Sequence, residues 1–467
     1  MSRSAGGSIG RPALILAAIN AALWVGGSET SIVFRSLGSA LLWVSAYPTL
    51  RYLARPRSEV PFVPAYCAVY FVAYGLPAFF AATPVAARVP PPDAITEALV
   101  LALAGECLFL VVYAAMPREL LRLVPSSGLG LRPGFNRRLL VAAVLFSSLA
   151  VAKHVVSFPV ALAEPLRVLG QLGWLSVLAL GLAWSRGQLV AASKLVVGVT
   201  AVVMLLVELG TGSIANPIRL VCAGLFVFAY EKRRLPVGPV LAAALLFAPF
   251  LVTKAAFRER AWTGASLGLV ERTGLFLSIT YDALAKGELE TGSASETIRD
   301  RASHLSTLAY VMEATPTIVP YWGGGSYGTL VWSLVPRVLY PDKPVKTLGQ
   351  EFGHRYQFLG AEDATTSYNF EQLVEMYANF GWLGAMVGMA ALGALYRMLR
   401  KWLGGGDGGA LVGALVWTGL LSLECDFSVV HGTVVQTVVV CALFLRVLRA
   451  GRNFGPNRFV AGQVVSG

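Results

Sequence analysis

Residues 98–115 read ALVLALAGECLFLVVYAA and contain one charged side chain, Glu106. An apolar stretch of roughly this length crosses the hydrocarbon core of a bilayer as a helix. A helix is required there because lipid offers no partner to unpaired backbone N–H and C=O groups. The segment therefore predicts a transmembrane helix. Glu106 is a functional candidate, because a carboxylate inside a membrane is costly.

The same pattern recurs along the whole chain. Its 467 residues are 56% hydrophobic and 14% charged, with a mean hydropathy of +0.64. Soluble domains carry about a quarter charged residues. We therefore expect an all-α polytopic membrane protein with about 12 transmembrane helices, over Pro12–Gly26, Phe34–Leu50, Pro61–Ala82, Ala98–Ala115, Leu139–His154, Val168–Trp184, Leu189–Leu209, Pro217–Tyr230, Val237–Thr253, Leu383–Tyr396, Ala410–Leu423 and Val434–Leu445.

The basic residues predict the orientation. Short segments between the apolar runs hold more than half of the 38 Lys and Arg residues and few of the 26 Asp and Glu residues. Such clusters mark cytoplasmic loops, so both termini are expected in the cytoplasm. The net charge of +12 then reflects these cytoplasmic loops, and we expect no nucleic-acid partner. The clusters lie in the N-terminal tail and at 51–59, 118–138, 186, 231–234, 397–407 and 446–458.

Three regions follow from this map. Residues 1–253 form a transmembrane bundle of about nine helices, and 381–467 contain the last helices and a cytoplasmic tail. Residues 254–380 form one large extracytoplasmic loop, with amphipathic stretches at Leu267–Leu284 and Ser295–Glu313. A loop of this length is usually functional. None of the five cysteines lies in it.

The beginning of the loop is rich in charge, including Lys254, Arg258 and Glu259. Long cationic side chains at this depth can extend to the membrane surface while their stems stay in apolar surroundings. They can also bind a lipid phosphate. Both readings of Arg258 remain open.

The second part of the loop contains WGGGSY from Trp322 to Tyr327 and VPRVLYPDKP from 335 to 344. Three prolines within nine residues exclude a regular helix and fix an extended backbone. A rigid backbone that carries Arg337 and Lys343 suits a preformed anion site. The alternative is a turn that packs on the membrane surface.

Two carboxylates follow at the start of the tenth predicted helix. Asn369 and Gln372 have the spacing of a capping box, and Glu371 and Glu375 lie one turn apart on one face. Paired carboxylates can act as a general base and its partner. They can equally form a structural ion network with Arg355 or Arg337.

Ionisable residues are rare within the predicted spans. Glu208 ends the seventh span, and Arg219 opens the eighth after a Thr211-Gly-Ser213 turn, which makes Arg219 a second candidate anion ligand. Lys153 and His154 lie at an outer helix end, where a lone histidine is interpreted as an interfacial residue. The sequence has no HExxH or Walker motif, so we expect no metal or other cofactor.

Three segments of the chain resemble bacterial O-antigen and exopolysaccharide repeat-unit polymerases, the Wzy-like group. They are residues 335–344, Gly353–Tyr356 (GHRY) and Glu371–Trp382 (EQLVEMYANFGW). The turn at 211–213 with Arg219 resembles a second, shorter element of that family. The number of spans and the single long outer loop are similar as well. These motifs cover about a tenth of the chain.

The resemblance implies a metal-independent glycosyltransferase of the GT-C type, which uses polyprenyl-diphosphate-linked oligosaccharides. Its diphosphate-binding residues would be Arg337, Arg355, Arg219, Lys343 and Arg258. Its sugar-stacking aromatics would be Trp322, Tyr327, Tyr356 and Tyr368. The general base stays open among Glu371, Glu375, Asp342 and His354. A chain-length regulator protein is an expected partner, and the bacterial inner membrane is the expected location.

Other activities are compatible with the sequence. An O-antigen ligase moves a finished glycan to a different acceptor, and His354 beside Arg355 keeps this reading open. A transporter or flippase of lipid-linked sugars would place charge along a path through the spans, where only Glu106 is central. A purely structural scaffold is the fourth reading.

Overall fold

The computed structural model describes residues 10–28, 31–54, 60–80, 82, 84–85, 88–124, 136–156, 158–234, 237–263, 267–287, 304–335, 340, 342, 347–364, 366–404, 406–420 and 425–450. Over these residues the regular structure is helical and no β-strand occurs, apart from an isolated bridge between Val85 and Arg88. The predicted all-α class is confirmed for this part of the chain.

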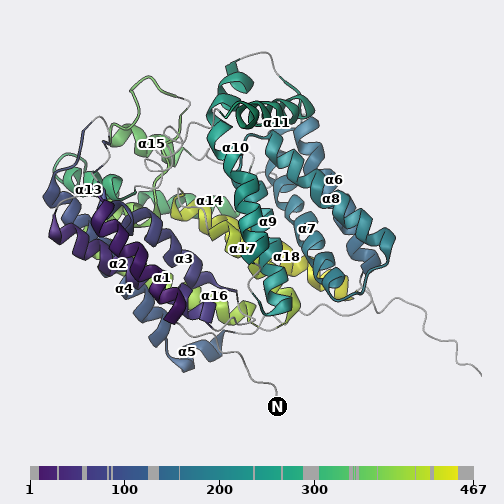
Figure 1. Ribbon diagram of the computed structural model, residues 1–467, viewed down its shortest axis with the longest axis horizontal. Helices are drawn as coiled ribbons and strands as arrows, with labels where there is room; N and C mark the ends of the chain where they lie inside the picture. Colours follow the sequence, from purple (N-terminus) through teal and green to yellow (C-terminus); the bar gives the residue numbers. More distant parts are fainter. Residues whose placement is uncertain are drawn as a thin grey trace, which may run out of the picture.

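The N-terminal helices form a first bundle with two helices from later in the chain. α16 packs along α4, and α13 packs against both. Figure 1 shows α1 to α4 together on one side of the molecule. The members of the first bundle are α1 (Gly10–Gly26), α2 (Ile32–Ala54), α3 (Phe62–Tyr70) with η1 (Phe71–Gly75) and η2 (Pro77–Phe79), α4 (Pro92–Ala115), α13 (His304–Ala314) and α16 (Gln372–Leu403).

The middle of the chain forms a second bundle. α6 packs on α7, and α9 packs on α7 and α17. Figure 1 shows α6 to α9 on the side of the molecule away from α1 to α4. The members of the second bundle are α6 (Asn136–Val155), α7 (Val160–Ser185), α8 (Ala191–Gly210), α9 (Ala215–Lys232), α10 (Val237–Thr263), α11 (Leu269–Lys286), α17 (Asp407–Leu420) and α18 (Phe427–Ala450).

Eight of the twelve predicted spans are long and apolar enough to cross a membrane. The other four are helical but fall short. α1 and α17 have 17 and 14 residues, about 25 Å and 21 Å at 1.5 Å per residue, against roughly 30 Å of hydrocarbon. α2 carries Arg35 and Arg51, and α9 carries Arg219 and ends in Glu231 and Lys232. The eight are Phe62–Phe79, Pro92–Ala115, Arg137–Val155, Pro165–Ser185, Ala191–Gly210, Gly238–Ala261, Gln372–Leu403 and Phe427–Leu448.

The segment predicted as a loop is itself largely helical. α10 continues to Thr263, ten residues past its predicted end, because the charges from Lys254 onward end the hydropathy signal without ending the helix. α16 begins at Gln372, eleven residues before the predicted start. Between them the described residues form α11, as the amphipathic pattern predicted, and α13, followed by η3 (Gly325–Tyr327), α14 (Gly328–Leu334) and α15 (Leu348–Arg355).

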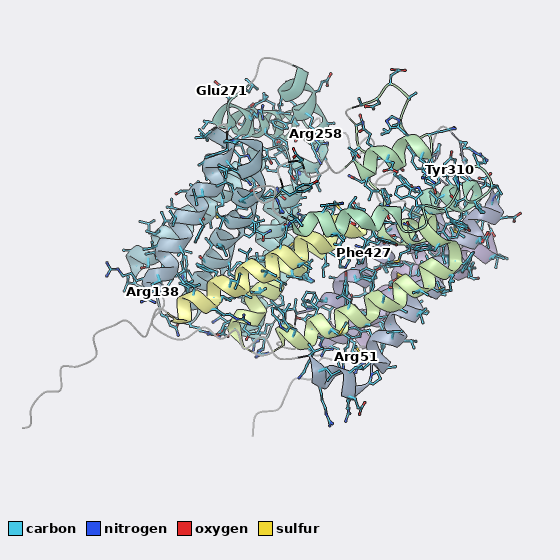
Figure 2. The ribbon with its side chains drawn as sticks, turned by 180° about the vertical axis from the view of Figure 1, so that it is seen from behind. Arg51, Arg138, Arg258, Glu271, Tyr310 and Phe427 are labelled. Atoms are coloured by element: carbon cyan, nitrogen blue, oxygen red, sulfur yellow. The ribbon has the colours of Figure 1, made fainter. Side chains whose placement is uncertain are left out.

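The two ends of the molecule differ. Figure 2 shows Arg51 and Arg138 toward one end and Arg258, Glu271 and Tyr310 toward the other. In Figure 1 the short helix α5 (Arg118–Leu123) lies at the first of these ends, and α11, α13 and α15 lie at the second. α11, α13 and α15 therefore share an end, which we call the loop end.

Candidate functional site

The start of α16 is fixed by Glu371. Its carboxylate accepts hydrogen bonds from the Tyr74 hydroxyl at 2.6 Å and from the Leu373 backbone at 2.8 Å. Glu371 is therefore the N-cap, and the predicted capping box of Asn369 and Gln372 is wrong. Glu371 lies one residue before α16, which is long and apolar enough to cross a membrane, and burial raises the pKa of Glu371 to about 7.

One turn later, Glu375 joins three segments of the fold. Its fully buried carboxylate accepts hydrogen bonds from the Ser326 hydroxyl and from the Phe427 backbone N–H, each at 2.6 Å. Asn379 adds a bond from Nδ2 to Ser326 Oγ at 2.8 Å and one to Oδ1 from the Gly324 backbone at 2.9 Å. We call these four residues, Ser326, Glu375, Asn379 and Phe427, the α16 clamp. The α16 clamp connects the first bundle to the turn at residues 323–325 and to α18.

The predicted sugar-binding aromatics divide into two groups. Tyr356 is buried, and its hydroxyl lies 2.7 Å from Thr315 Oγ1. Burial raises its pKa. Tyr368 lies 3.1 Å from Thr307 Oγ1 and stacks on Phe358, with ring centroids 4.2 Å apart. These two rings belong to the core of the segment around α15.

Trp322 and Tyr327 lie at the border of that core. Trp322 packs edge-on against Phe352, and the Arg355 guanidinium lies 5.3 Å from its ring centroid. Arg355 also donates a hydrogen bond to the Pro320 carbonyl at 2.6 Å. Tyr327 packs against Phe427, next to the α16 clamp.

The remaining loop candidates have different environments. Arg337 and Lys343 lie outside the described residues. Asp342 is exposed, and His354 on α15 is half-buried. Arg258 is half-buried on α10, and Figure 2 places it at the loop end. Figure 1 places α15 over the first bundle, away from α6 to α9, so Arg355 and Arg219 belong to different parts of the molecule.

Arg219 lines a polar cavity of about 310 Å³ in the second bundle. Lys153 from α6, Arg167 from α7 and Glu208 from α8 line the same cavity, so four consecutive helices contribute to it. Thr418 of α17, with Thr433 and Thr437 of α18, lines it too. We call this the cation cavity.

The cation cavity has an excess of positive charge. Three cationic side chains, Lys153, Arg167 and Arg219, face one carboxylate, Glu208, among its described lining residues. Glu208 Oε2 accepts a hydrogen bond from Asn216 Nδ2 at 2.8 Å, and Arg167 donates to Gln436 Oε1 at 2.7 Å. A surplus of fixed cations between apolar helices favours an anionic ligand.

Lys153 stands near the end of α6 remote from Arg138, and Arg167 and Arg219 lie near the starts of α7 and α9. Since Arg138 is remote from the loop end in Figure 2, the cation cavity lies toward the loop end. The sequence pattern placed Lys153 at an outer helix end and gave no role to Arg167. The recurrence of a cation at one end of α6, α7 and α9 is the signal that could have identified both.

An apolar groove lies at the start of α18. It measures about 610 Å³ and is lined by Tyr327 and Phe427 and by α16 residues including Phe380, Leu383 and Val387. Phe427 precedes Thr433 of the cation cavity by six residues on α18, which is about 9 Å along the helix axis. An apolar groove and a cationic cavity thus flank the first turns of one helix.

Among the described residues, no group of three or more His, Cys, Asp or Glu side chains is arranged to hold a metal ion.

Comparison with known proteins gives one match. Residues 136–451 match the family model described as Domain of unknown function (DUF8712). No curated protein and no solved structure matches the chain. The matched region begins at the start of α6 and ends just after α18, so it contains every residue of the cation cavity and of the α16 clamp. The chain therefore belongs to the DUF8712 family.

Proposed function

We propose that this protein is a membrane-embedded glycosyltransferase, which polymerises polyprenyl-diphosphate-linked oligosaccharide repeat units into O-antigen, capsule or exopolysaccharide. The observation that carries the proposal is the cation cavity. This cavity has three cationic side chains, Lys153, Arg167 and Arg219, and one carboxylate, Glu208. Its net charge between apolar helices is therefore positive. A lipid-linked diphosphate is an anion that is delivered from within the bilayer.

The proposed reaction is a substitution at an anomeric carbon. The acceptor hydroxyl oxygen forms a bond to that carbon, the bond from the carbon to the diphosphate oxygen breaks, and the polyprenyl diphosphate leaves. Negative charge builds up on the diphosphate, and fixed guanidinium groups stabilise it without reorganisation. Arg167 and Arg219 are suited to this role because a guanidinium binds phosphate oxygens in pairs.

The acceptor proton needs a base. Asp342 is exposed and His354 is half-buried, so both are accessible to a hydroxyl. Glu371 and Glu375 are buried and already accept hydrogen bonds from Tyr74 and Ser326. His354 lies on α15, away from α6 to α9 and the cation cavity. We therefore favour Asp342 over His354 and the two glutamates for proton transfer.

The apolar groove between α16 and Phe427 supports a lipid-linked substrate, because isoprenoid units are apolar and Phe427 precedes Thr433 of the cation cavity by six residues on α18. In the proposed topology the loop end faces outward from a bacterial inner membrane and both termini are cytoplasmic. The end that carries Arg51 and Arg138 then faces the cytoplasm, in accord with the positive-inside rule. A chain-length regulator is a proposed partner.

The test is a gel of surface glycan from cells that lack the gene, restored with wild-type protein, with Arg167→Gln or Arg219→Gln, or with the exposed control Arg122→Gln. We expect single repeat units on the normal acceptor in the deletion strain and in the two cavity variants, and full polymer in the control. Full-length polymer stranded on its lipid carrier would identify a ligase. Unchanged glycan in the deletion strain would reject both activities.

A further inference from the structure

A second cavity, of about 440 Å³, lies at the end of the molecule remote from the loop end. It is bounded by Leu121 of α5, by the ends of α9 and α16 and by the start of α17. Figure 1 shows α5 at the opposite end from α11, α13 and α15. This basic cavity is therefore separate from the cation cavity, and it does not enter the proposed reaction.

Four cationic side chains line the basic cavity: Arg233, Arg397, Arg400 and Lys401. None of its described lining residues is acidic. Two carboxylates close in sequence to lining residues, Glu231 and Asp407, both form ion pairs with Arg186, at 2.8 Å and 2.6 Å. The Arg186 guanidinium also lowers the pKa of Asp407. These two carboxylates therefore balance the charge of Arg186 and not the charge of the basic cavity.

Aromatic rings orient the arginines without cancelling their charge. The guanidiniums of Arg397 and Arg400 lie 5.4 Å and 6.0 Å from the Tyr113 ring centroid, and Arg400 donates to the Tyr113 hydroxyl at 2.8 Å. Arg233 lies 5.5 Å from the Tyr230 ring. A cation held against a ring face keeps its full charge, so these groups are preoriented for an anion.

A further observation indicates that the basic cavity is built for a ligand. Arg397 Nε is buried and has no hydrogen-bond acceptor among the described residues, and a buried unpaired donor is costly.

We propose that the basic cavity binds a phosphate polyanion carrying at least two phosphate groups. Four like charges around one cavity repel each other, and a ligand with several negative charges removes that repulsion. A single phosphate would leave much of a 440 Å³ cavity unfilled. Two sources share this chemistry: a diphosphate in solution, or the headgroup of a lipid with two phosphates in the adjoining leaflet, which basic pockets between transmembrane helices bind.

The test uses the full-length purified protein and two probes. Thermal unfolding is followed in detergent with increasing inorganic pyrophosphate, and in phosphatidylcholine nanodiscs with and without cardiolipin. Because a ligand of the folded state raises the melting temperature in a saturable manner, we expect one probe to do so. Arg397→Gln and Lys401→Gln should each weaken that binding about tenfold, and Arg397→Lys should weaken it less.

Arg51→Gln is the matched control, since it removes an exposed cation at the same end of the molecule without changing the cavity lining. Saturable stabilisation by pyrophosphate that the cavity variants lose identifies a soluble ligand. The same result with cardiolipin alone identifies a lipid. Equal responses in wild type, Arg51→Gln and the cavity variants would overturn the proposal, as would no response to either probe in the wild type. The polymer gel does not enter this test, so each proposal can fail alone.

Discussion

The hydroxyl of Ser326 lies 2.6 Å from Glu375 Oε1, while the other oxygen of that carboxylate accepts the Phe427 backbone N–H. A single buried side chain thus connects residues that are 49 and 52 positions away in the sequence. This arrangement supports a structural role for Glu375, although its position beside Glu371 in the sequence also suggested catalysis.

A structural role can be separated from a catalytic one by substitution. Ser326→Ala leaves the Glu375 carboxylate and the Asn379 amide each one partner short, and we expect a loss of about 1–3 kcal/mol in the free energy of unfolding. Glu375→Gln turns an N–H group toward one of two donors and should destabilise similarly. Thermal unfolding in detergent measures both. A Glu375→Gln protein of normal stability that makes no polymer would instead indicate a catalytic carboxylate.

Acidification should destabilise the fold through His304. This side chain is buried on α13, its Nε2 atom has no partner among the described residues, and burial lowers its pKa to about 4. The unfolded value is about 6.5. Because the folded pKa is the lower one, the stabilisation is complete above pH 6.5 and is lost as the pH falls toward 4.

The shift corresponds to about 3 kcal/mol at 1.36 kcal/mol per unit. The measurement is the free energy of unfolding between pH 4 and 7 for wild type and His304→Phe, which keeps a ring at this position. The difference between the two curves should change across that range. A constant difference would mean that His304 titrates alike in both states.

The kink in α16 requires glycine at position 381. Gly381 has φ of 63° and ψ of −150°, a conformation essentially restricted to glycine. A Cβ atom there would lie 2.6 Å from the Tyr321 hydroxyl. Gly381→Ala should lower the free energy of unfolding by about 1–3 kcal/mol. Gly198→Ala is the control, because it lies within α8 with nothing within 4 Å of its Cβ position, and it should be neutral or stabilising.

Polymer formation should depend on the charge and the shape of the cation cavity. Arg219→Gln removes an expected diphosphate contact and should reduce the rate of polymerisation roughly 10²-fold, as the loss of one transition-state donor does. Arg219→Lys restores the charge without the paired donors and should recover only part of the activity. The rate is measured with lipid-linked repeat units and purified protein. Equal activity in both variants and wild type would exclude Arg219 from the site.

The loop arginine that the sequence singled out provides a separate test. Arg337→Ala should abolish polymer while the protein still inserts and folds, if Arg337 binds the second lipid diphosphate. Glycan gels and membrane abundance of the variant, measured together, check this. Normal polymer in a folded Arg337→Ala protein would remove the residue from the proposed site.

The helices were predictable from sequence, but their contacts were not. All twelve apolar segments are helical where the structure describes them, because lipid exposure permits few alternatives to a helix. The cap of α16 was mispredicted, because Glu371 is selected by Tyr74, a residue 297 positions earlier. Arg167 was missed for a related reason. Its convergence with Lys153 and Arg219 depends on how α6, α7 and α9 pack, and no local pattern encodes that packing.

The pairing of α4 with α16 also bears on how the chain is assembled. Trp382 donates a hydrogen bond from Nε1 to Glu97 at 2.7 Å across a separation of 285 residues. At a synthesis rate of 5–20 residues per second, α4 is made roughly 15–60 s before its partner helix. During that interval the face of α4 that packs against α16, including Gly105, lacks the helix that covers it. The nascent first bundle then needs a transient neighbour, such as an insertion factor or another helix of the same chain, until α16 is synthesised.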